Sequence, residues 1–211
     1  MMARIRGLYA LTPDETDTGI LLSKTARALE GGVSLVQYRN KTASASLRAI
    51  QARALLDLCR RHAVPLIIND HLNLALSVDA DGLHLGGEDG DLAAARQALG
   101  PDKLLGASCY DRYDLALAAK AAGADHVAFG AAFSSPTKPG AARAQHSLYT
   151  RAANELGLPV VAIGGITREN AREVIKAGAS AVAVISSLFD AQDIVREASL
   201  FMTLFGQIKP S

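Results

Sequence analysis

Three polar side chains alternate along one extended apolar segment of the chain. Gln37, Arg39 and Lys41 lie two residues apart, so in a β-strand they project from the same face. Glutamine can hydrogen-bond a ring nitrogen or an amino group, whereas arginine and lysine match phosphate oxygens. The spacing therefore predicts a surface that binds a phosphorylated heteroaromatic compound. The alternative interpretation is a polar strand end that is exposed to solvent.

Carboxylates follow two other apolar segments. Asp70 ends the segment 64–70, and Asp89 comes shortly after the segment 82–86. Two carboxylates together with phosphate oxygens form a usual Mg²⁺ site, because this ion keeps several of its waters. We therefore expect Asp70 and Asp89 to bind magnesium. Capping of the following helices by these two residues is the alternative interpretation.

Glycines and hydroxyl-bearing residues follow the last apolar segments. Gly164 and Gly165 precede a helix that we expect Thr167 to cap, and Ser186 follows the final segment. Backbone N–H groups at glycines and helix N-termini bind phosphate oxygens, and in barrels the loops after strands seven and eight usually form such a site. The loop 134–140, with two serines, a threonine and a lysine around two prolines, is predicted to be a phosphate lid; a plain surface loop is the alternative.

The elements that must position these residues are short strands alternating with helices. Three stretches, 28–36, 121–129 and 176–184, share one pattern in which a helix ends at glycine and a strand follows a small turn, with a looser copy at 79–82. Such repeated units predict an α/β fold, a single-domain (β/α)₈ TIM barrel over residues 1–211. An open doubly wound sheet is the main alternative, but no Gly-x-Gly-x-x-Gly follows the first segment. The eight expected strands span 4–12, 33–41, 64–70, 82–86, 104–109, 126–133, 160–165 and 181–187.

Composition favours small-molecule partners. The 211 residues are 49% hydrophobic with a net charge of +1, and five Phe, five Tyr and no Trp leave few rings to stack on bases. We therefore expect no nucleic-acid partner. Two cysteines, Cys59 and Cys109, cannot form a secreted disulfide framework, and no apolar run suits a signal peptide or a membrane span. We expect a cytoplasmic protein with no membrane partner.

Histidines and cysteines offer little further chemistry. His84 and His126 are expected to be hydrogen-bonded structural residues, whereas His71 lies beside the expected metal carboxylates. Cys59 is expected in the core, and Cys109 is not expected to be catalytic. The absence of His-Glu-x-x-His, Cys-x-x-Cys, Walker and Gly-x-Ser-x-Gly motifs argues against zinc, thiol and serine-hydrolase chemistry.

Taken in order, these segments resemble the thiamine-phosphate synthase family, also called thiamine-phosphate pyrophosphorylase. The likeness runs from Gly7-Leu-Tyr-Ala-Leu-Thr-Pro13 to Ser186-Ser187. Its specific motifs are Val36-Gln-Tyr-Arg-Asn-Lys41, Ile68-Asn-Asp70, Asp81-Gly-Leu-His-Leu-Gly86 with Asp89, Pro136-Thr-Lys138 and Ala162-Ile-Gly-Gly-Ile166. The chain departs from the family at Gly87, where a glutamine is usual, and at Phe133-Ser-Ser135, where Phe/Tyr-Pro-Thr is common.

The resemblance implies a transferase of class EC 2.5.1.3 that uses Mg²⁺ and two small-molecule substrates. It would join 4-amino-2-methyl-5-pyrimidinylmethyl diphosphate to hydroxyethylthiazole phosphate and release pyrophosphate. The implied pyrimidine and diphosphate contacts are Gln37, Arg39, Lys41, Asn69, Ser108 and Lys138, and the implied metal ligands are Asp70 and Asp89. The implied thiazole phosphate contacts are Ser135, Thr137, Gly165, Ile185 and Ser186. Of these residues, Arg39, Lys41, Ser108 and Lys138 are the expected catalytic ones.

This chemistry suits the residue types. A diphosphate on an electron-rich aminopyrimidine can leave before the thiazole nitrogen attacks, so cations are needed but no general base is. A thiazole tautomerase of the same fold is one alternative, although it would give Arg39, Lys41, Asp70 and Asp89 no common purpose. A sugar-phosphate isomerase would need an acid–base pair, and a non-catalytic phosphate-binding barrel would release no pyrophosphate.

Overall fold

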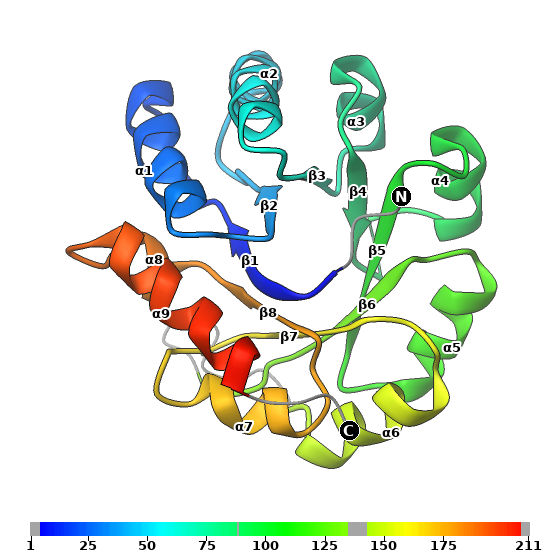
Figure 1. Cartoon of the computed structure of the whole chain (residues 1–211). Helices are drawn as coiled ribbons and strands as arrows, with labels where there is room; N and C mark the ends of the chain where they lie inside the picture. The colour runs from blue at the N-terminus through cyan, green and yellow to red at the C-terminus, as the bar shows by residue number, and fades with distance from the viewer. Residues whose placement is uncertain (1–4, 88, 135–142, 208–211) are drawn as a thin grey trace.

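The chain folds as a closed barrel of parallel strands surrounded by helices (Figure 1). The computed structural model describes residues 5–87, 89–134 and 143–207. Within them the strands are β1 (Gly7–Leu11), β2 (Leu35–Tyr38), β3 (Leu66–Asn69), β4 (Gly82–Leu85), β5 (Leu104–Tyr110), β6 (His126–Phe129), β7 (Val160–Ile163) and β8 (Ala181–Val184). The helices are α1 (Thr18–Glu30), α2 (Ala45–Arg61), α3 (Leu72–Val78), α4 (Leu92–Leu99), α5 (Tyr113–Ala121), α6 (His146–Glu155), α7 (Ala171–Lys176), α8 (Ser186–Phe189) and α9 (Ile194–Gln207).

The strands pair in the order of the sequence, and β8 returns to pair with β1, where Leu8 stands opposite Val182. The predicted TIM barrel is therefore confirmed, and the open doubly wound sheet is excluded. All eight expected strands are found, but several are shorter than expected. The second strand ends at Tyr38, so Arg39 and Lys41 lie beyond the residues that pair with neighbouring strands.

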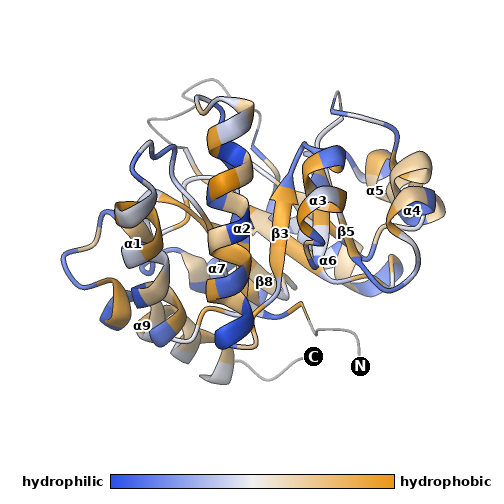
Figure 2. Cartoon of the chain, turned by 90° about the horizontal axis from the view of Figure 1, so that it is seen from above, coloured by the Kyte–Doolittle hydropathy of each residue, from blue (hydrophilic) through white to orange (hydrophobic). Residues whose placement is uncertain are grey.

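The core consists of two layers separated by the strands. Between strands and helices lies the larger layer, which includes Leu8, Val36, Leu55 and Phe201. Inside the barrel lies a smaller one, which includes Tyr9, Leu35, Ile67, Leu104 and Val161. Strands buried on both faces have little need of polar residues, and Figure 2 shows β3 and β5 as largely apolar among helices of mixed character.

The same side-chain to backbone hydrogen bond recurs at the end of the barrel where the strands begin. Asp81, Asp125 and Ser180 each stand directly before an even-numbered strand. Each side chain accepts the backbone N–H at the start of the preceding strand: Leu66 to Asp81 at 2.8 Å, Leu105 to Asp125 at 2.7 Å and Val160 to Ser180 at 2.8 Å. The sequence repeat seen above therefore has a physical basis, because its polar residue satisfies a donor that would otherwise lack a partner.

Three helices begin at side-chain caps, whereas α7 does not begin where the sequence predicts. Asp17, Ser44 and Asp91 accept N–H groups in the first turns of α1, α2 and α4. The expectation that Thr167 caps the seventh helix is wrong, since α7 begins at Ala171, after Asn170. The Asn170 side chain accepts the Thr167 N–H at 2.9 Å, so it stabilises the turn before the helix.

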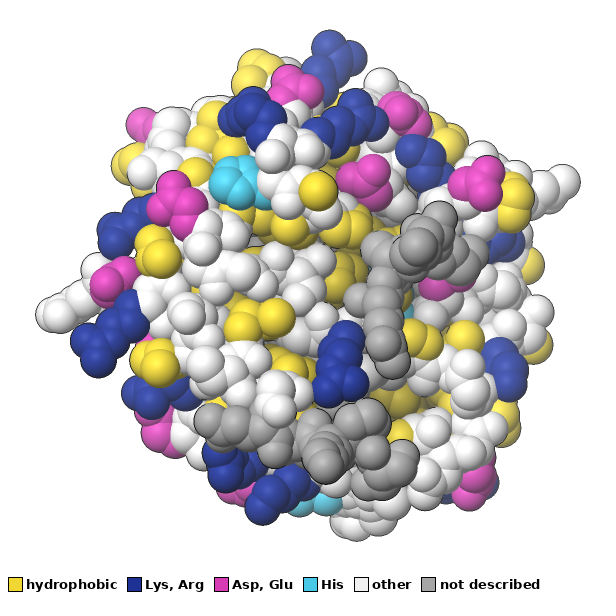
Figure 3. Space-filling model, in the orientation of Figure 1, with side chains coloured by type: hydrophobic (Ala, Val, Ile, Leu, Met, Phe, Trp, Pro, Cys, Tyr) yellow, Lys and Arg dark blue, Asp and Glu magenta, His cyan; other side chains and the backbone are white. Residues whose placement is uncertain are grey.

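Two surface properties bear on partners. Acidic and basic side chains are interspersed around the rim of the face shown in Figure 3, and neither sign dominates that face. Within the residues that the structure describes, no helix combines the length and the apolar character needed to cross a bilayer.

Candidate active site

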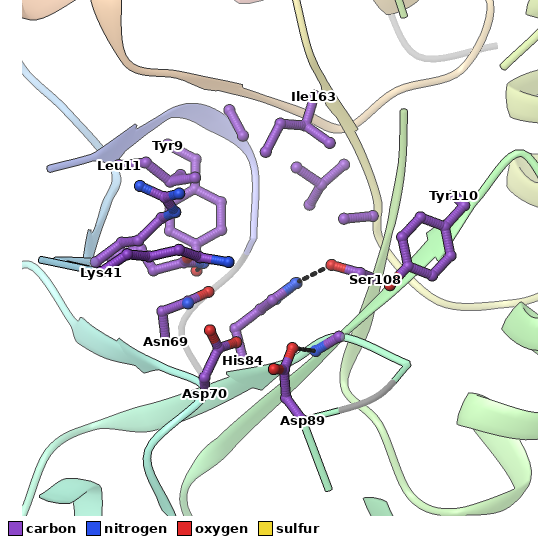
Figure 4. Close-up of a pocket in the computed structure, with 16 residues that line it drawn as sticks. Tyr9, Leu11, Lys41, Asn69, Asp70, His84, Asp89, Ser108, Tyr110 and Ile163 are labelled. Carbon is purple, nitrogen blue, oxygen red and sulfur yellow. Dashed lines mark hydrogen bonds between the residues drawn. The ribbon is translucent and has the colours of Figure 1, made fainter. Parts of the chain in front are cut away.

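A pocket opens at the end of the barrel toward which the strands point, and every strand contributes to it (Figure 4). Parallel strands bring their carboxyl ends to one face, which is why residues far apart in sequence meet there. The lining residues are Tyr9, Leu11, Gln37, Arg39, Lys41, Asn69, Asp70, His84, Gly86, Asp89, Ser108, Tyr110, Ala128, Val161, Ile163 and Ala183.

The second strand supplies the amide and the two cations of the pocket. Gln37, Arg39 and Lys41 all line it, as their two-residue spacing predicts. The Gln37 amide is buried and donates to the Tyr9 hydroxyl at 2.8 Å, which fixes the amide at the pocket floor. Asn40, between the two cations, points the other way: its side chain accepts the Ala43 N–H at 3.1 Å and turns the chain out of the barrel.

The third and fourth strands supply two carboxylates that face each other. Burial and the nearby Asp89 raise the pKa of Asp70 to about 6, while Lys41 and Arg39 act in the opposite direction. Figure 4 shows the two carboxylates side by side below Lys41. Like charges held together in a partly buried place favour a cation between them.

Helix capping does not explain either carboxylate. The residue that caps α4 is Asp91, whereas the Asp89 carboxylate accepts the Gly86 N–H at 3.1 Å. The residue before α3 is His71, and its side chain makes no capping bond. Asp70 has a φ of +63°, a left-handed conformation that is uncommon outside glycine. The capping alternative therefore fails for Asp70 and Asp89.

The donor set suits Mg²⁺. Carboxylate oxygens are the ligands that this ion prefers, and it keeps waters or takes phosphate oxygens at its other positions. The described residues include no group of three or more His, Cys, Asp or Glu side chains able to hold a metal. Asp70 and Asp89 could thus hold Mg²⁺ only together with water or substrate oxygens, which is the arrangement expected for a phosphorylated substrate.

Ser108 lies on the fifth strand and contacts a buried histidine of the fourth. His84 Nε2 lies 2.9 Å from the Ser108 hydroxyl. Burial lowers the pKa of His84 to about 4 and that of His126 to about 3, so both rings are neutral near pH 7. His84 is hydrogen-bonded, as expected, and it also lines the pocket, which sequence reasoning missed. The two rings lie 5.7 Å apart beside Gly106.

His126 differs from the expectation of a hydrogen-bonded residue. Both of its ring nitrogens lack a hydrogen-bond partner among the described residues, although the side chain is fully buried. Gly106 accounts for the close packing, because a Cβ there would stand 2.4 Å from the rings of both His126 and His84. The two thiols behave as expected: Cys59 and Cys109 are buried, and burial raises the pKa of each to about 12, which leaves no thiolate nucleophile.

Three of the residues expected to bind the second phosphate lie beyond the pocket lining. Gly165 follows β7, while Ile185 and Ser186 follow the neighbouring β8, and none of the three lines the pocket. Gly165 has a φ of +63°, and a Cβ there would stand 2.6 Å from the backbone oxygens of Phe133 and Ser134. The expected contacts Ser135, Thr137 and Lys138 lie outside the described residues.

Tyr110 is a pocket residue to which the sequence assigned no role, although it belongs to a polar strand ending, 108–110, that was expected to face the pocket. It ends β5 with a φ of +53° at an irregularity in the pairing with β6. The side chain is 48% exposed, and its hydroxyl accepts the Gly87 N–H at 3.2 Å. A Cβ on Gly87 would contact the Tyr110 ring at 3.5 Å, so the tyrosine stands beside the position where the family usually has glutamine.

Comparisons with known proteins agree with this geometry. The model of the family described as "Thiamine monophosphate synthase" matches residues 8–188. The thiamine-phosphate synthase of Methylobacillus flagellatus is 58% identical over 96% of both chains, and that of Thiobacillus denitrificans is 54% identical over 95% of both. A solved thiamine phosphate pyrophosphorylase from Pyrococcus furiosus superposes with a TM-score of 0.84 at 32% identity, covering 95% of this chain and 96% of the other.

Proposed function

Because the chain belongs to the thiamine monophosphate synthase family, we propose that the pocket at the end of its barrel performs that family's reaction. The family places the chain among the transferases that form thiamine phosphate. The proposal concerns the residues and the mechanism. The aminopyrimidine diphosphate would bind in the pocket, and its pyrophosphate would leave before the thiazole nitrogen attacks.

The observation that carries the proposal is the meeting of two cations and two carboxylates in one pocket. Arg39 and Lys41 are the groups that lower the pKa of Asp70, while burial and Asp89 raise it. A protein that bound only a monophosphate would have no use for a carboxylate pair. A diphosphate with a divalent ion uses all four groups.

Each side chain has a role that follows from its place. Gln37, held by Tyr9, would pair with the pyrimidine ring, and Asn69 and Ser108 would complete its polar contacts. Arg39 and Lys41 would stabilise the charge that develops on the departing pyrophosphate, as fixed donors do for other oxyanions. The neutral His84 would orient the Ser108 hydroxyl.

Asp70 and Asp89 would hold Mg²⁺, which when bound neutralises charge on the leaving group. Loss of the diphosphate would leave a cation on the pyrimidine methylene, and the apolar wall of Val161 and Ile163 would keep water from trapping it. The nucleophile is a neutral ring nitrogen, so no general base is required.

The thiazole phosphate would bind beside the pocket, at the ends of β7 and β8. Gly165, Ile185 and Ser186 would contact its phosphate, with Ser135 and Thr137 from the preceding loop. Lys138 from the same loop would reach the diphosphate. Support for this part comes from the resemblance and from the position of Gly165 against the backbone at 133–134.

We further propose that the protein acts in the cytoplasm on small molecules, without a nucleic-acid or membrane partner. Its two described cysteines are unpaired and buried, which is typical of a reducing compartment.

The two alternative functions, a thiazole tautomerase and a non-catalytic phosphate-binding barrel, are disfavoured, because neither would use the carboxylate pair.

The test is a pyrophosphate-release assay with both substrates. We expect release that depends on Mg²⁺ and stops with EDTA. Lys41→Ala should lower kcat/KM by about 100-fold, roughly the effect of losing one donor to a developing anion. Lys103→Ala, at a lysine that pairs with Asp79 at the opposite end of the barrel, is the matched control. Release unaffected by EDTA, or equal in the two variants, would contradict the proposal.

A further inference from the structure

The segment after β1 lies against the segment that carries both pocket cations. Thr12 is fully buried, and its hydroxyl bonds both backbone groups of Arg39. It donates to the Arg39 carbonyl and accepts the Arg39 N–H, each at 2.9 Å. The Thr12 N–H also donates to the Gln37 carbonyl at 2.9 Å. One residue thus ties the end of β1 to the backbone between Gln37 and Arg39.

Asp14 continues this contact two residues later. One of its carboxylate oxygens accepts the backbone N–H of Lys41 at 2.8 Å and lies 3.4 Å from Nη1 of Arg39. The contact to Lys41 uses its main chain and not its ammonium group. The carboxylate therefore holds both residues at once: it fixes the backbone of Lys41 and the guanidinium of Arg39.

A buried amide pair holds the other side of the same loop. Asn40 and Gln51 both donate to the Glu15 carbonyl, at 2.8 Å and 2.9 Å, and the Tyr38 hydroxyl donates to Gln51 at 2.8 Å. The backbone of Glu15 is thereby anchored to α2. Because Asp14 directly precedes Glu15, this anchor also restricts the position of Asp14. Because Asp14 is fixed in this way, its carboxylate can restrain Arg39 and Lys41, which the sheet does not hold.

We propose that Asp14 is a positioning residue for Arg39 and Lys41, with Thr12 as its buried support. Both cations lie beyond the end of β2, so the strand ladder does not hold them, and the 12–14 segment takes over that role. The inference rests on the proposed function, because it assumes that the two cations bind a diphosphate. A cation fixed before the ligand arrives loses less freedom on binding.

Three variants separate positioning from stability. Asp14→Ala removes the acceptor, whereas Asp14→Asn keeps an amide oxygen that can accept the Lys41 N–H. Asp17→Ala is the matched control, since Asp17 lies in the same loop but caps α1 through the Ile20 N–H at 2.9 Å. Each protein is measured by urea unfolding, by calorimetric binding of inorganic pyrophosphate with Mg²⁺, and by steady-state kinetics.

We expect Asp14→Ala to weaken pyrophosphate binding and to raise the KM for the aminopyrimidine diphosphate about tenfold, the effect of losing hydrogen bonds to charged groups. The kcat should fall as well, because the same two cations stabilise the departing pyrophosphate. Asp14→Asn should stay within about threefold of wild type. Asp17→Ala should lower stability and leave both binding constants unchanged.

The outcomes also separate this inference from the proposed function. Wild-type turnover tests the function, and the variant-to-wild-type ratio of pyrophosphate affinity tests the positioning. Asp14→Ala with wild-type affinity would overturn the inference while leaving the function intact, and so would an equal change in Asp17→Ala. Wild-type protein that binds pyrophosphate but forms no product would overturn the function alone. Wild-type protein that binds none would overturn both.

Discussion

The environment of Gly87 shows how one departure from a family pattern can be accommodated. A glutamine there would meet the Tyr110 ring, which lies at contact distance from the place of a Cβ. The Tyr110 hydroxyl instead accepts the Gly87 N–H, in the same loop whose Gly86 N–H donates to Asp89. Tyr110 therefore supports the loop that carries one of the proposed metal ligands.

Tyr110→Phe removes only this acceptor. We expect the Mg²⁺ concentration for half-maximal pyrophosphate release to rise about tenfold, the effect usual for a lost partner around a metal ligand. Tyr113→Phe is the control, because the Tyr113 hydroxyl bonds Glu155 on the outer helices at 3.2 Å. Identical Mg²⁺ titrations for the two variants would show that Tyr110 does not support Asp89.

Much of the pocket could be predicted at this scale from spacing alone. Alternation along a strand identified Gln37, Arg39 and Lys41 as one set, because side chains two apart share a face. The same rule would have found Tyr9, two residues before Leu11, but an aromatic residue in an apolar run carries no polar signal. The contacts of Tyr110 could not be predicted, since the direction of its side chain depends on a positive φ and a pairing irregularity that no sequence rule specifies.

At the scale of elements, polar residues directly before β4, β6 and β8 bind the backbone at the start of the preceding strand. Asp125 is the strongest example, because its carboxylate accepts the Leu105 N–H and pairs with Arg96 of α4, and both side chains are about four-fifths buried. Arg96 also donates to the carbonyls of Gly100 and Lys103, so it joins α4 to the loops beneath the barrel.

Asp125→Ala should lower the free energy of unfolding by about 3 kcal/mol, because it leaves a mostly buried guanidinium without its charge partner. Ser180→Ala should cost less, about 2 kcal/mol, since two neutral hydrogen bonds to the Val160 backbone are lost. Urea unfolding measures both. The KM for either substrate should stay unchanged, because this end of the barrel is remote from the pocket; equal losses for the two variants would contradict the assignment.

Helix boundaries were less predictable than strand order. Thr167 has the residue type and the position of a cap, yet the turn 168–170 comes first and the helix begins at Ala171. The choice is made by Asn170, whose side chain bonds Thr167 and the Gly165 carbonyl at 3.0 Å. Local propensity cannot decide between two polar residues three positions apart when the geometry of the loop selects one of them.

At the scale of the whole molecule, two neutral histidines under the pocket make stability depend on pH. The folded-state pKa values of His84 and His126, about 4 and about 3, lie below the ordinary value near 6.5 that applies to the unfolded chain. Between these limits the unfolded chain binds protons that the folded chain does not. The contribution of these two histidines to stability therefore decreases as the pH falls from about 6.5 toward 4, by about 1.4 kcal/mol per pH unit for each histidine. The raised pKa of Asp70, about 6, contributes in the opposite direction in the same window.

His126→Leu should remove about half of this histidine-dependent slope, because one of the two titrating groups is lost. Urea unfolding at several pH values between 6.5 and 4 measures it. His62→Gln, at an exposed position, is the control and should leave the slope as it is. A His126→Leu protein with the wild-type slope would show that His126 is protonated in the folded state.

The fold of the whole molecule followed from the sequence because the barrel repeats one unit. Glycine at a helix end, a small turn and an apolar strand recur often enough to fix both the strand order and the face where the polar ends meet. The placement of His126 was not predictable. Its burial depends on Gly106 in the neighbouring strand, and such a pair across strands becomes visible only in the register.

The pairing of the first strand with the last also affects how the protein can be made. Met202 of α9 lies against β1, with its sulfur 3.2 Å from the Leu8 nitrogen, and β8 completes the ring. While the chain emerges from the ribosome, β1 lacks this neighbour until residues 181–184 have been translated, so a nascent chain presents two open sheet edges. Such edges pair readily with other chains, and ring closure is the step that ends this exposure.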